Sequence, residues 1–315
     1  MRVFITGSTG FAGSHLVDQL LAEGHQVFGL VHPATSNQPV NPHPNFVAIE
    51  GDLLVLDSLK VAVAASRPEQ VYHLAGQALT AQSWQKPALT LQVNTIGTVN
   101  LLEAVVAYGR PKTVIVTSAE IYGAIRPGDL PITERSVPQP RHPYGVSKWA
   151  AGQLVPLYQQ RYDLPVVEAR PFNHIGPRQT LGFVVPDFAS QLAAIKLGQL
   201  PPEMLVGNLS AERDFTDVRD VARAYRALAD RARPGETYII CSGRAVAIQV
   251  LLEALVRLAG VSVTINYDPA RMRPSDTPVL FGSYGKIQQD TGWVPTIGLE
   301  QSLADALAEW LARGG

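Results

Sequence analysis

The stretch VFITGSTGFAG, residues 3–13, decides the fold of this chain. Residues 3–6 have the β-branched and aromatic composition of a strand, glycines follow at positions 7, 10 and 13, and residues 14–21 carry leucines at helical spacing. In such a strand, loop and helix, the glycines let backbone approach a pyrophosphate, whose charge is attracted by free amides at the helix start. A glycine turn without a ligand is the alternative. The strand expected at 26–31 arrives at the spacing of a βαβ unit and favours dinucleotide binding.

Strands and helices alternate along the first half of the chain. Later apolar strands are expected at 46–50, 71–76, 113–117 and 166–170. This alternation predicts an α/β fold with a doubly wound parallel Rossmann sheet and a second, smaller α/β lobe. The proline-rich exit after residue 170 marks the boundary between them. The predicted dinucleotide-binding domain comprises 1–170 and 212–242, and the predicted substrate domain comprises 171–211 and 243–315.

Composition excludes several classes of protein. The 315 residues are 46% hydrophobic and 17% charged, and a formal charge of −1 gives no general field for nucleic acid or an anionic membrane. The single cysteine, Cys241, excludes an internal disulfide and fits a reducing compartment, and no stretch approaches the roughly 20 apolar residues of a membrane span. None of the seven histidines has a second one at metal-ligand spacing, so His73 is interpreted as a packed strand residue. We expect a cytoplasmic protein with no metal site that binds neither nucleic acid nor a membrane.

A tyrosine and a lysine four residues apart, Tyr144 and Lys148, share one face of a predicted helix. A free tyrosine has a pKa near ~10, and a nearby ammonium is expected to lower it by stabilising the phenolate. Ser118 follows the strand at 113–117, where its hydroxyl can hydrogen-bond a reacting carbonyl. The alternatives are a core tyrosine, a solvated lysine and a serine that only caps its turn.

Together, the glycine loop, the turn Ser118 to Gly123 and the Tyr144–Lys148 pair resemble the extended short-chain dehydrogenase/reductase family. In that family a Ser or Thr, a Tyr and a Lys act over a nicotinamide ring, so the resemblance implies NADP(H) or NAD(H) as cofactor. It also implies a homodimer through a four-helix seam formed by the helix at 89–106 and the helix that carries Tyr144. The cofactor-binding residues that it implies are Gly7, Gly10, Phe11, Ala12, Gly13, His32, Asp52, Leu53, Leu74, Ala75, Gly76, Tyr144, Lys148 and Pro171.

The end of the second strand usually distinguishes the two nicotinamide cofactors, because an acidic residue there binds the ribose 2′-hydroxyl and a basic residue binds the 2′-phosphate. Here His32 stands at that point, which argues against strict NAD use without deciding the preference. Asp52 matches the family's adenine contact. Its alternative role is to cap the following helix.

Four later motifs look like those of the GDP-4-keto-6-deoxy-D-mannose reductases: RPFNHIGP (170–177), ERDFTDVRDVARAY (212–225), RPSDTPVLFG (273–282) and TGWVP (291–295). The resemblance implies reduction of the C4 carbonyl to give GDP-D-rhamnose or its C4 epimer, with Tyr144 as the acid. It implies a GDP-sugar held by Ser118, Glu120, Asn173, Arg213 and Arg273. The two arginines would bind the pyrophosphate, for which a planar guanidinium is suited, and a plain surface role is the alternative for each.

Two other functions remain open at this stage. A GDP-mannose 4,6-dehydratase is a close cousin and uses the position of Glu120 to remove the C5 proton, although related reductases also carry Glu there. Ala119 stands where dehydratases have Asp or Ser, and alanine cannot donate a proton, which favours reduction. Gly282-Ser283 departs from the Gly-Asp that is common to both cousins. The third possibility, a dinucleotide-sensing regulator, would not need the tyrosine and lysine.

Overall fold

Seven parallel strands form the central sheet of the first lobe in a computed structural model that describes residues 1–32, 43–123, 125–271 and 277–314. All six neighbouring pairs are parallel, so the predicted doubly wound sheet is confirmed. In spatial order the strands are β3 (Phe46–Glu50), β2 (Gln26–Val31), β1 (Arg2–Thr6), β4 (Gln70–His73), β5 (Lys112–Val116), β6 (Val166–Pro171) and β10 (Thr237–Ile240).

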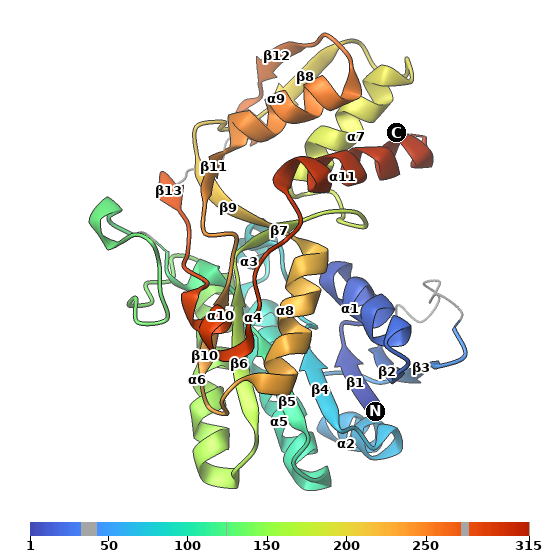
Figure 1. The fold of residues 1–315 in the computed structure, drawn as a ribbon, viewed down its shortest axis with the longest axis vertical. Coiled ribbons are helices and arrows are strands. Elements are labelled where there is room, and N and C mark those ends of the chain that lie inside the picture. Colours follow the sequence, from blue (N-terminus) through green and yellow to red (C-terminus); the bar gives the residue numbers. More distant parts are fainter. Residues whose placement is uncertain (33–42, 124, 272–276, 315) are drawn as a thin grey trace.

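Helices cover both faces of this sheet (Figure 1). Side chains alternate across a strand, and accordingly Val3 and Ile5 of β1 join one apolar core while Phe4 joins the core on the opposite face. The first core packs under α1 (Phe11–Ala22), α8 (Val218–Arg231) and α10 (Gly285–Thr291). The second packs under α2 (Leu56–Ser66), α5 (Gly97–Tyr108) and α6 (Pro143–Tyr162).

The helix expected at 89–106 is longer than predicted and has three parts. They are α4 (Pro87–Leu91), a π-helical turn (Gln92–Ile96) and α5 (Gly97–Tyr108), preceded by the short α3 (Thr80–Gln85). By length and composition the run Pro87–Tyr108 could cross a membrane, which corrects the expectation that no stretch comes close. The run packs against α2 and α6 as one layer of the first lobe, as an apolar core helix does.

The second lobe combines three helices with short strands. Its core lies between α7 (Val184–Lys196), α9 (Ile248–Ala259) and α11 (Leu299–Arg313). One sheet contains β11 (Ala245–Ala247), β9 (Glu212–Asp217), β13 (Val279–Leu280) and β7 (Asn173–Ile175), and β8 (Glu203–Val206) pairs with β12 (Thr264–Tyr267). Single turns of 3₁₀ helix occur at Ala119–Ile121, Pro127–Asp129 and Pro269–Arg271.

The chain passes between the lobes more often than the predicted ranges imply. The expected return of part of 212–242 is made by β10, which pairs with β6, and by α8, which packs on α1. By contrast, β9 lies in the sheet of the second lobe, and α10 packs against α8 and β10 of the first. The division into two domains stays a prediction, with its boundaries best placed at β9 and α10.

Candidate active site

The glycine loop joins β1 to α1 with very close backbone contacts. Gly7 has a φ of +75°, and a Cβ there would lie 2.7 Å from the nitrogen of Ala75. A Cβ on Gly13 would lie 1.9 Å from the carbonyl oxygen of Gly7, so only glycine allows α1 to begin this close to the loop. Gly10 is the N-cap of α1 and contributes no side-chain cap, so the amides of Phe11, Ala12 and Gly13 remain available to an anion. The loop therefore fits the pyrophosphate of a dinucleotide.

His32, predicted to bear on the choice of cofactor, and Asp52, predicted to contact the adenine, lie together just beyond the ends of β2 and β3. His32 Nε2 is 3.6 Å from Asp52 Oδ2, and both side chains are substantially exposed. Asp52 does not cap α2, whose N-cap is Val55; its Oδ1 instead accepts the backbone N–H of Leu54 at 2.8 Å. Leu53 follows in the same turn, where its carbonyl accepts from Asn100 Nδ2 at 2.9 Å.

The end of β4 lies between the glycine loop and the predicted catalytic helix. Leu74 N–H donates to the carbonyl of Thr6 at 3.1 Å, and Ala75 N–H donates to Thr6 Oγ1 at 3.3 Å. A Cβ on Gly76 would lie 3.3 Å from Lys148 Nζ, so this backbone runs directly beside the ammonium.

His73 is packed inside the sheet, in agreement with its interpretation as a strand residue. Its ring nitrogens lie 2.7 Å from Thr6 Oγ1 and 3.0 Å from Thr98 Oγ1. Burial lowers the pKa of His73 to about 3, so the ring is neutral. Within the described residues, no three His, Cys, Asp or Glu side chains gather as a metal ion would require.

Ser118 and Tyr144 meet beside the end of β5. Ser118 is the cap of the 3₁₀ turn Ala119–Ile121, where its Oγ accepts the N–H of Glu120 at 3.2 Å. The capping role considered from sequence is thus real. The Ser118 side chain also lies near enough to the phenol of Tyr144 to lower its pKa, and both residues are buried.

The expected direction of the tyrosine's pKa shift is wrong. Burial raises the pKa of Tyr144 to about 12; the hydrogen bond from Ser118 lowers it, and the charge of Glu120 raises it further. Lys148 does not contribute to this shift in the pKa of Tyr144, and its ammonium donates to the carbonyl of Val116 at 2.9 Å. Desolvation of the phenolate therefore outweighs any attraction to the ammonium, and Tyr144 stays protonated through the neutral range, as an acid must.

Lys148 is buried rather than solvated, and burial lowers its pKa to about 8, while the charge of Glu168 raises it. Glu168 itself forms a two-pronged ion pair with Arg170, at 2.8 Å for both contacts. Thr117 Oγ1 and Thr237 Oγ1 donate to the same carboxylate at 2.6 and 2.8 Å. This network was not predicted from the sequence, although a Glu and an Arg at alternate positions of a buried strand could have indicated it.

Glu120 is held by a residue that the sequence analysis also missed. His142 Nε2 lies 3.0 Å from Glu120 Oε2, and His142 Nδ1 accepts the N–H of Gly145 at 2.9 Å as the N-cap of α6. The His142 and Tyr144 rings stack with centroids 6.0 Å apart. A polar residue directly before Pro143 was the signal for a helix start, but nothing local indicated the contact with Glu120.

The remaining predicted residues lie where the chain enters the second lobe. Pro171 ends β6 beside Ile240, and Asn173 in β7 pairs with Phe215 of β9. Arg213 Nη1 donates to the carbonyl of Glu212 at 2.7 Å, and Arg213 interacts electrostatically with Glu120, which raises its pKa against the larger lowering by burial. Arg273 lies outside the described residues, so its predicted role is not placed.

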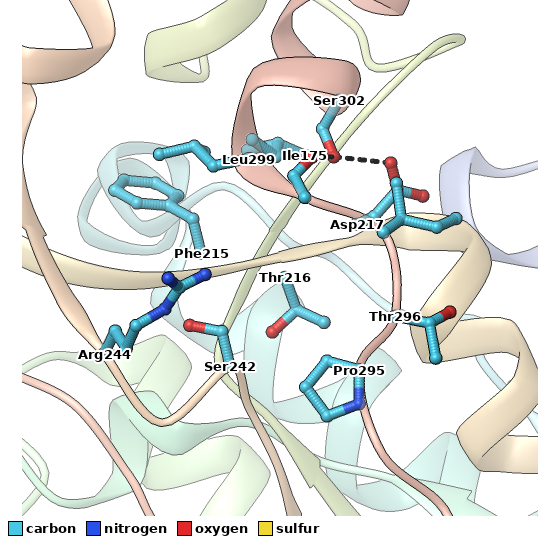
Figure 2. Close-up of a pocket in the computed structure, with 12 residues that line it drawn as sticks. Ile175, Phe215, Thr216, Asp217, Ser242, Arg244, Pro295, Thr296, Leu299 and Ser302 are labelled. Atoms are coloured by element: carbon cyan, nitrogen blue, oxygen red, sulfur yellow. Dashed lines mark hydrogen bonds between the residues drawn. The ribbon is translucent and has the colours of Figure 1, made fainter.

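A cavity of about 120 Å³ lies between β9 and the chain that leads into α11 (Figure 2), and its wall includes Phe215, the strand partner of Asn173. Thr216, Arg244 and Pro295 are part of its wall, and across one edge Ser302 Oγ donates to Asp217 Oδ2 at 2.6 Å. None of its lining residues is a predicted site residue. We place the candidate active site at the strand ends instead, because the paired hydroxyls and the buried lysine are there.

A parallel sheet with a glycine loop and a Ser, Tyr and Lys set at its carboxyl edge defines an NAD(P)-dependent oxidoreductase of the extended short-chain dehydrogenase/reductase class. A family model described as GDP-mannose 4,6 dehydratase matches residues 4–306. The chain belongs to this family.

Its relatives include both reductases and dehydratases. The GDP-6-deoxy-D-mannose reductase of Pseudomonas aeruginosa is 40% identical over 99% of this chain and 98% of its own length. The GDP-mannose 4,6-dehydratase of Yersinia enterocolitica is 27% identical over 98% and 93%. Among solved structures, RMD from Pseudomonas aeruginosa complexed with NADPH has a TM-score of 0.88 at 36% identity, covering 99% of this chain and 100% of that one. The Thermotoga maritima UDP-glucose 4-epimerase with UDP-glucose has a TM-score of 0.90 at 28% identity, with 99% of each chain covered.

Proposed function

We propose that this protein reduces the C4 carbonyl of GDP-4-keto-6-deoxy-D-mannose to GDP-D-rhamnose, with a nicotinamide cofactor as the reductant. The observation that carries the proposal is that Tyr144 and Lys148 are buried together on α6, with the buried Ser118 near the phenol. A nearly full-length relative at 40% identity is a reductase of this kind.

The protein's own residues supply a proton and hold the carbonyl. Bound NADPH or NADH would supply the hydride that adds to C4. As the carbonyl oxygen gains charge, the Ser118 hydroxyl can donate a hydrogen bond to it, and Tyr144 can give it a proton. With its pKa raised to about 12, Tyr144 holds that proton at neutral pH. One hydride and one proton convert the ketone to the alcohol, and one cofactor is oxidised per product.

The alternative is the 4,6-dehydratase, with which the carboxylate of Glu120 near Tyr144 is also compatible. Ala119 argues against it, because this residue is buried in an apolar cluster and has no proton to give to a departing C6 hydroxyl. The two reactions differ in stoichiometry, since a dehydratase returns its hydride to the sugar and consumes no cofactor.

This stoichiometry gives the test. One reaction contains GDP-mannose alone, and the other contains the 4-keto-6-deoxy sugar with NADPH or NADH, followed by the absorbance of the reduced cofactor. A reductase oxidises one cofactor per product in the second reaction. Accumulation of 4-keto sugar in the first, with no cofactor oxidation in the second, overturns the proposal in favour of the dehydratase.

NADP(H) is the proposed cofactor, with NAD(H) as the alternative. His32, rather than a carboxylate, follows β2, and the relative from Pseudomonas aeruginosa was solved with NADPH. A ratio of kcat/KM for NADPH over NADH above one supports the assignment, and a ratio below one reverses it.

A homodimer through α4, α5 and α6 is also proposed. The helical run from α4 through the π-helical turn to α5, together with α6, exposes apolar side chains at Leu89, Ile96, Val146, Trp149 and Leu157. A charge at the centre of a seam is costly to bury, so Leu157→Glu is expected to give monomers in sedimentation at micromolar concentration. Val61→Glu, on an exposed residue of α2, is the control. A wild-type monomer would contradict the proposal.

A further inference from the structure

The imidazole of His142 makes two polar contacts that indicate which ring nitrogen accepts and which donates. Gly145 donates its backbone N–H to Nδ1 at 2.9 Å, and a backbone N–H can only donate. Nδ1 therefore carries a lone pair, and the proton of the neutral ring is on Nε2, which lies 3.0 Å from Glu120 Oε2. His142 thus accepts from the start of α6 and donates to a carboxylate 22 residues earlier in the chain.

Glu120 is held from two sides and still reaches the open side of the site. Its N–H donates to Ser118 Oγ at 3.2 Å, and its carboxylate accepts from His142. The Glu120 side chain is 36% exposed, whereas that of His142 is 13% exposed. A carboxylate that accepts one hydrogen bond retains capacity for more, so Glu120 can also accept a hydroxyl of a bound ligand.

The ring of His142 also ties this carboxylate to the catalytic helix. It stacks on Tyr144 with an interplanar angle of 15°, and as the cap it sits at the first turn of α6. A shift of the ring would therefore move Glu120 relative to the phenol.

We propose that His142 is a positioning residue that acts through Glu120, which it holds beside Tyr144 as the acceptor for a hydroxyl of the sugar. The nature of that sugar rests on the function proposed above. Capping α6 does not by itself require a histidine at position 142. Ser or Asn would also accept the N–H of Gly145, but either side chain would be too short to reach Glu120.

This difference supplies matched variants. His142→Asn and His142→Ser keep a cap acceptor and lose the donor to Glu120, whereas His142→Ala loses both. We expect the first two to unfold at the wild-type temperature and His142→Ala to unfold lower. If either His142→Asn or His142→Ser folds poorly, the measurements are made on the other variant.

The decisive measurement is a double-mutant cycle of wild type, His142→Asn, Glu120→Ala and the double variant, with kcat and KM for the sugar determined separately. Losing a hydrogen bond to a charged group predicts about a tenfold loss in kcat/KM for His142→Asn, mainly through KM. In the Glu120→Ala background the same change should cost less than about twofold, because the group that His142 holds is gone. Equal losses in both backgrounds, or none in either, would overturn the proposal.

The activity of the wild-type protein distinguishes a failure of this inference from a failure of the proposed function. If wild type does not oxidise NADPH with the 4-keto sugar, the proposed reductase is wrong, and the cycle is repeated with the Kd of GDP-mannose measured by calorimetry. A weaker Kd for His142→Asn that vanishes in the Glu120→Ala background supports the positioning role. Additive changes, or no change, refute it.

Discussion

Two ends of the central sheet differ in how firmly their polar side chains are held. At the buried end, formed by β5 and β6, the side chains of Glu168 and Arg170 in β6 are 1% and 7% exposed and share three further hydrogen-bonding partners. At the exposed end, beyond β2 and β3, His32 and Asp52 are 52% and 34% exposed and lie 3.6 Å apart. A change to one member of the buried pair should therefore cost more stability than a change to one member of the exposed pair.

The sharpest test of the buried end is Tyr144→Phe. This change removes one hydroxyl and keeps the ring, so the fold should persist, while kcat/KM for reduction falls by roughly 10²–10⁴, as expected for removal of a positioned acid. Steady-state cofactor oxidation measures it, and cofactor binding, followed by fluorescence, is the control. A variant with near wild-type turnover would show that the phenol is not the acid, as a dinucleotide-sensing regulator would require.

Glu168→Gln tests whether the buried network carries stability. Because Arg170 would keep its charge in a dry site with no carboxylate, the free energy of unfolding should fall by about 3–5 kcal/mol in urea. The matched control is Glu236→Gln, which breaks the partly exposed pair with Lys286 and should cost no more than about 1 kcal/mol. Equal effects of the two changes would show that burial of an ion pair does not determine how much it contributes to stability here.

The buried lysine predicts a pH dependence. The pKa of Lys148 is lowered to about 8 from 10.5, so the folded protein loses this proton before the unfolded chain does. Burying the charged lysine therefore destabilises the folded state below about pH 8. This cost decreases as the pH rises from about 8 to 10.5, so the free energy of unfolding should increase over that range.

Activity should follow the opposite course, because the ammonium is lost over the same range. We expect kcat/KM for NADPH, which reports the free enzyme, to decline above a pH of about 8. A profile that is flat to pH ~10 would contradict the role of the ammonium, since an ordinary lysine has a pKa near ~10.4.

The exposed end should give the smallest effect on stability. His32→Ala removes the exposed contact with Asp52, and the free energy of unfolding should change by less than about 1 kcal/mol. If His32 donates to the 2′-phosphate of NADPH, the preference for NADPH over NADH should fall about tenfold. An unchanged preference would place the selecting contact elsewhere.

The sequence by itself determined the repeating parts of the molecule. Short apolar runs alternating with helices predicted the parallel sheet, and the glycines of residues 7–13 predicted the loop, because both patterns are local in the sequence. The four-residue spacing of Tyr144 and Lys148 likewise placed them on one helix face. The family resemblance located the substrate class, which no local pattern could have supplied.

Tertiary structure alone decided how the site residues act on one another. The raised pKa of Tyr144 is the outcome of burial against nearby charges, and its sign depends on how completely the sheet and helices exclude water. The contact of His142 with Glu120 and the placement of β9 in the second sheet join segments that are distant in sequence. A sequence pattern reports which residues share a strand or a helix face. It does not report the distances and solvent exclusion that set the strength of an electrostatic interaction.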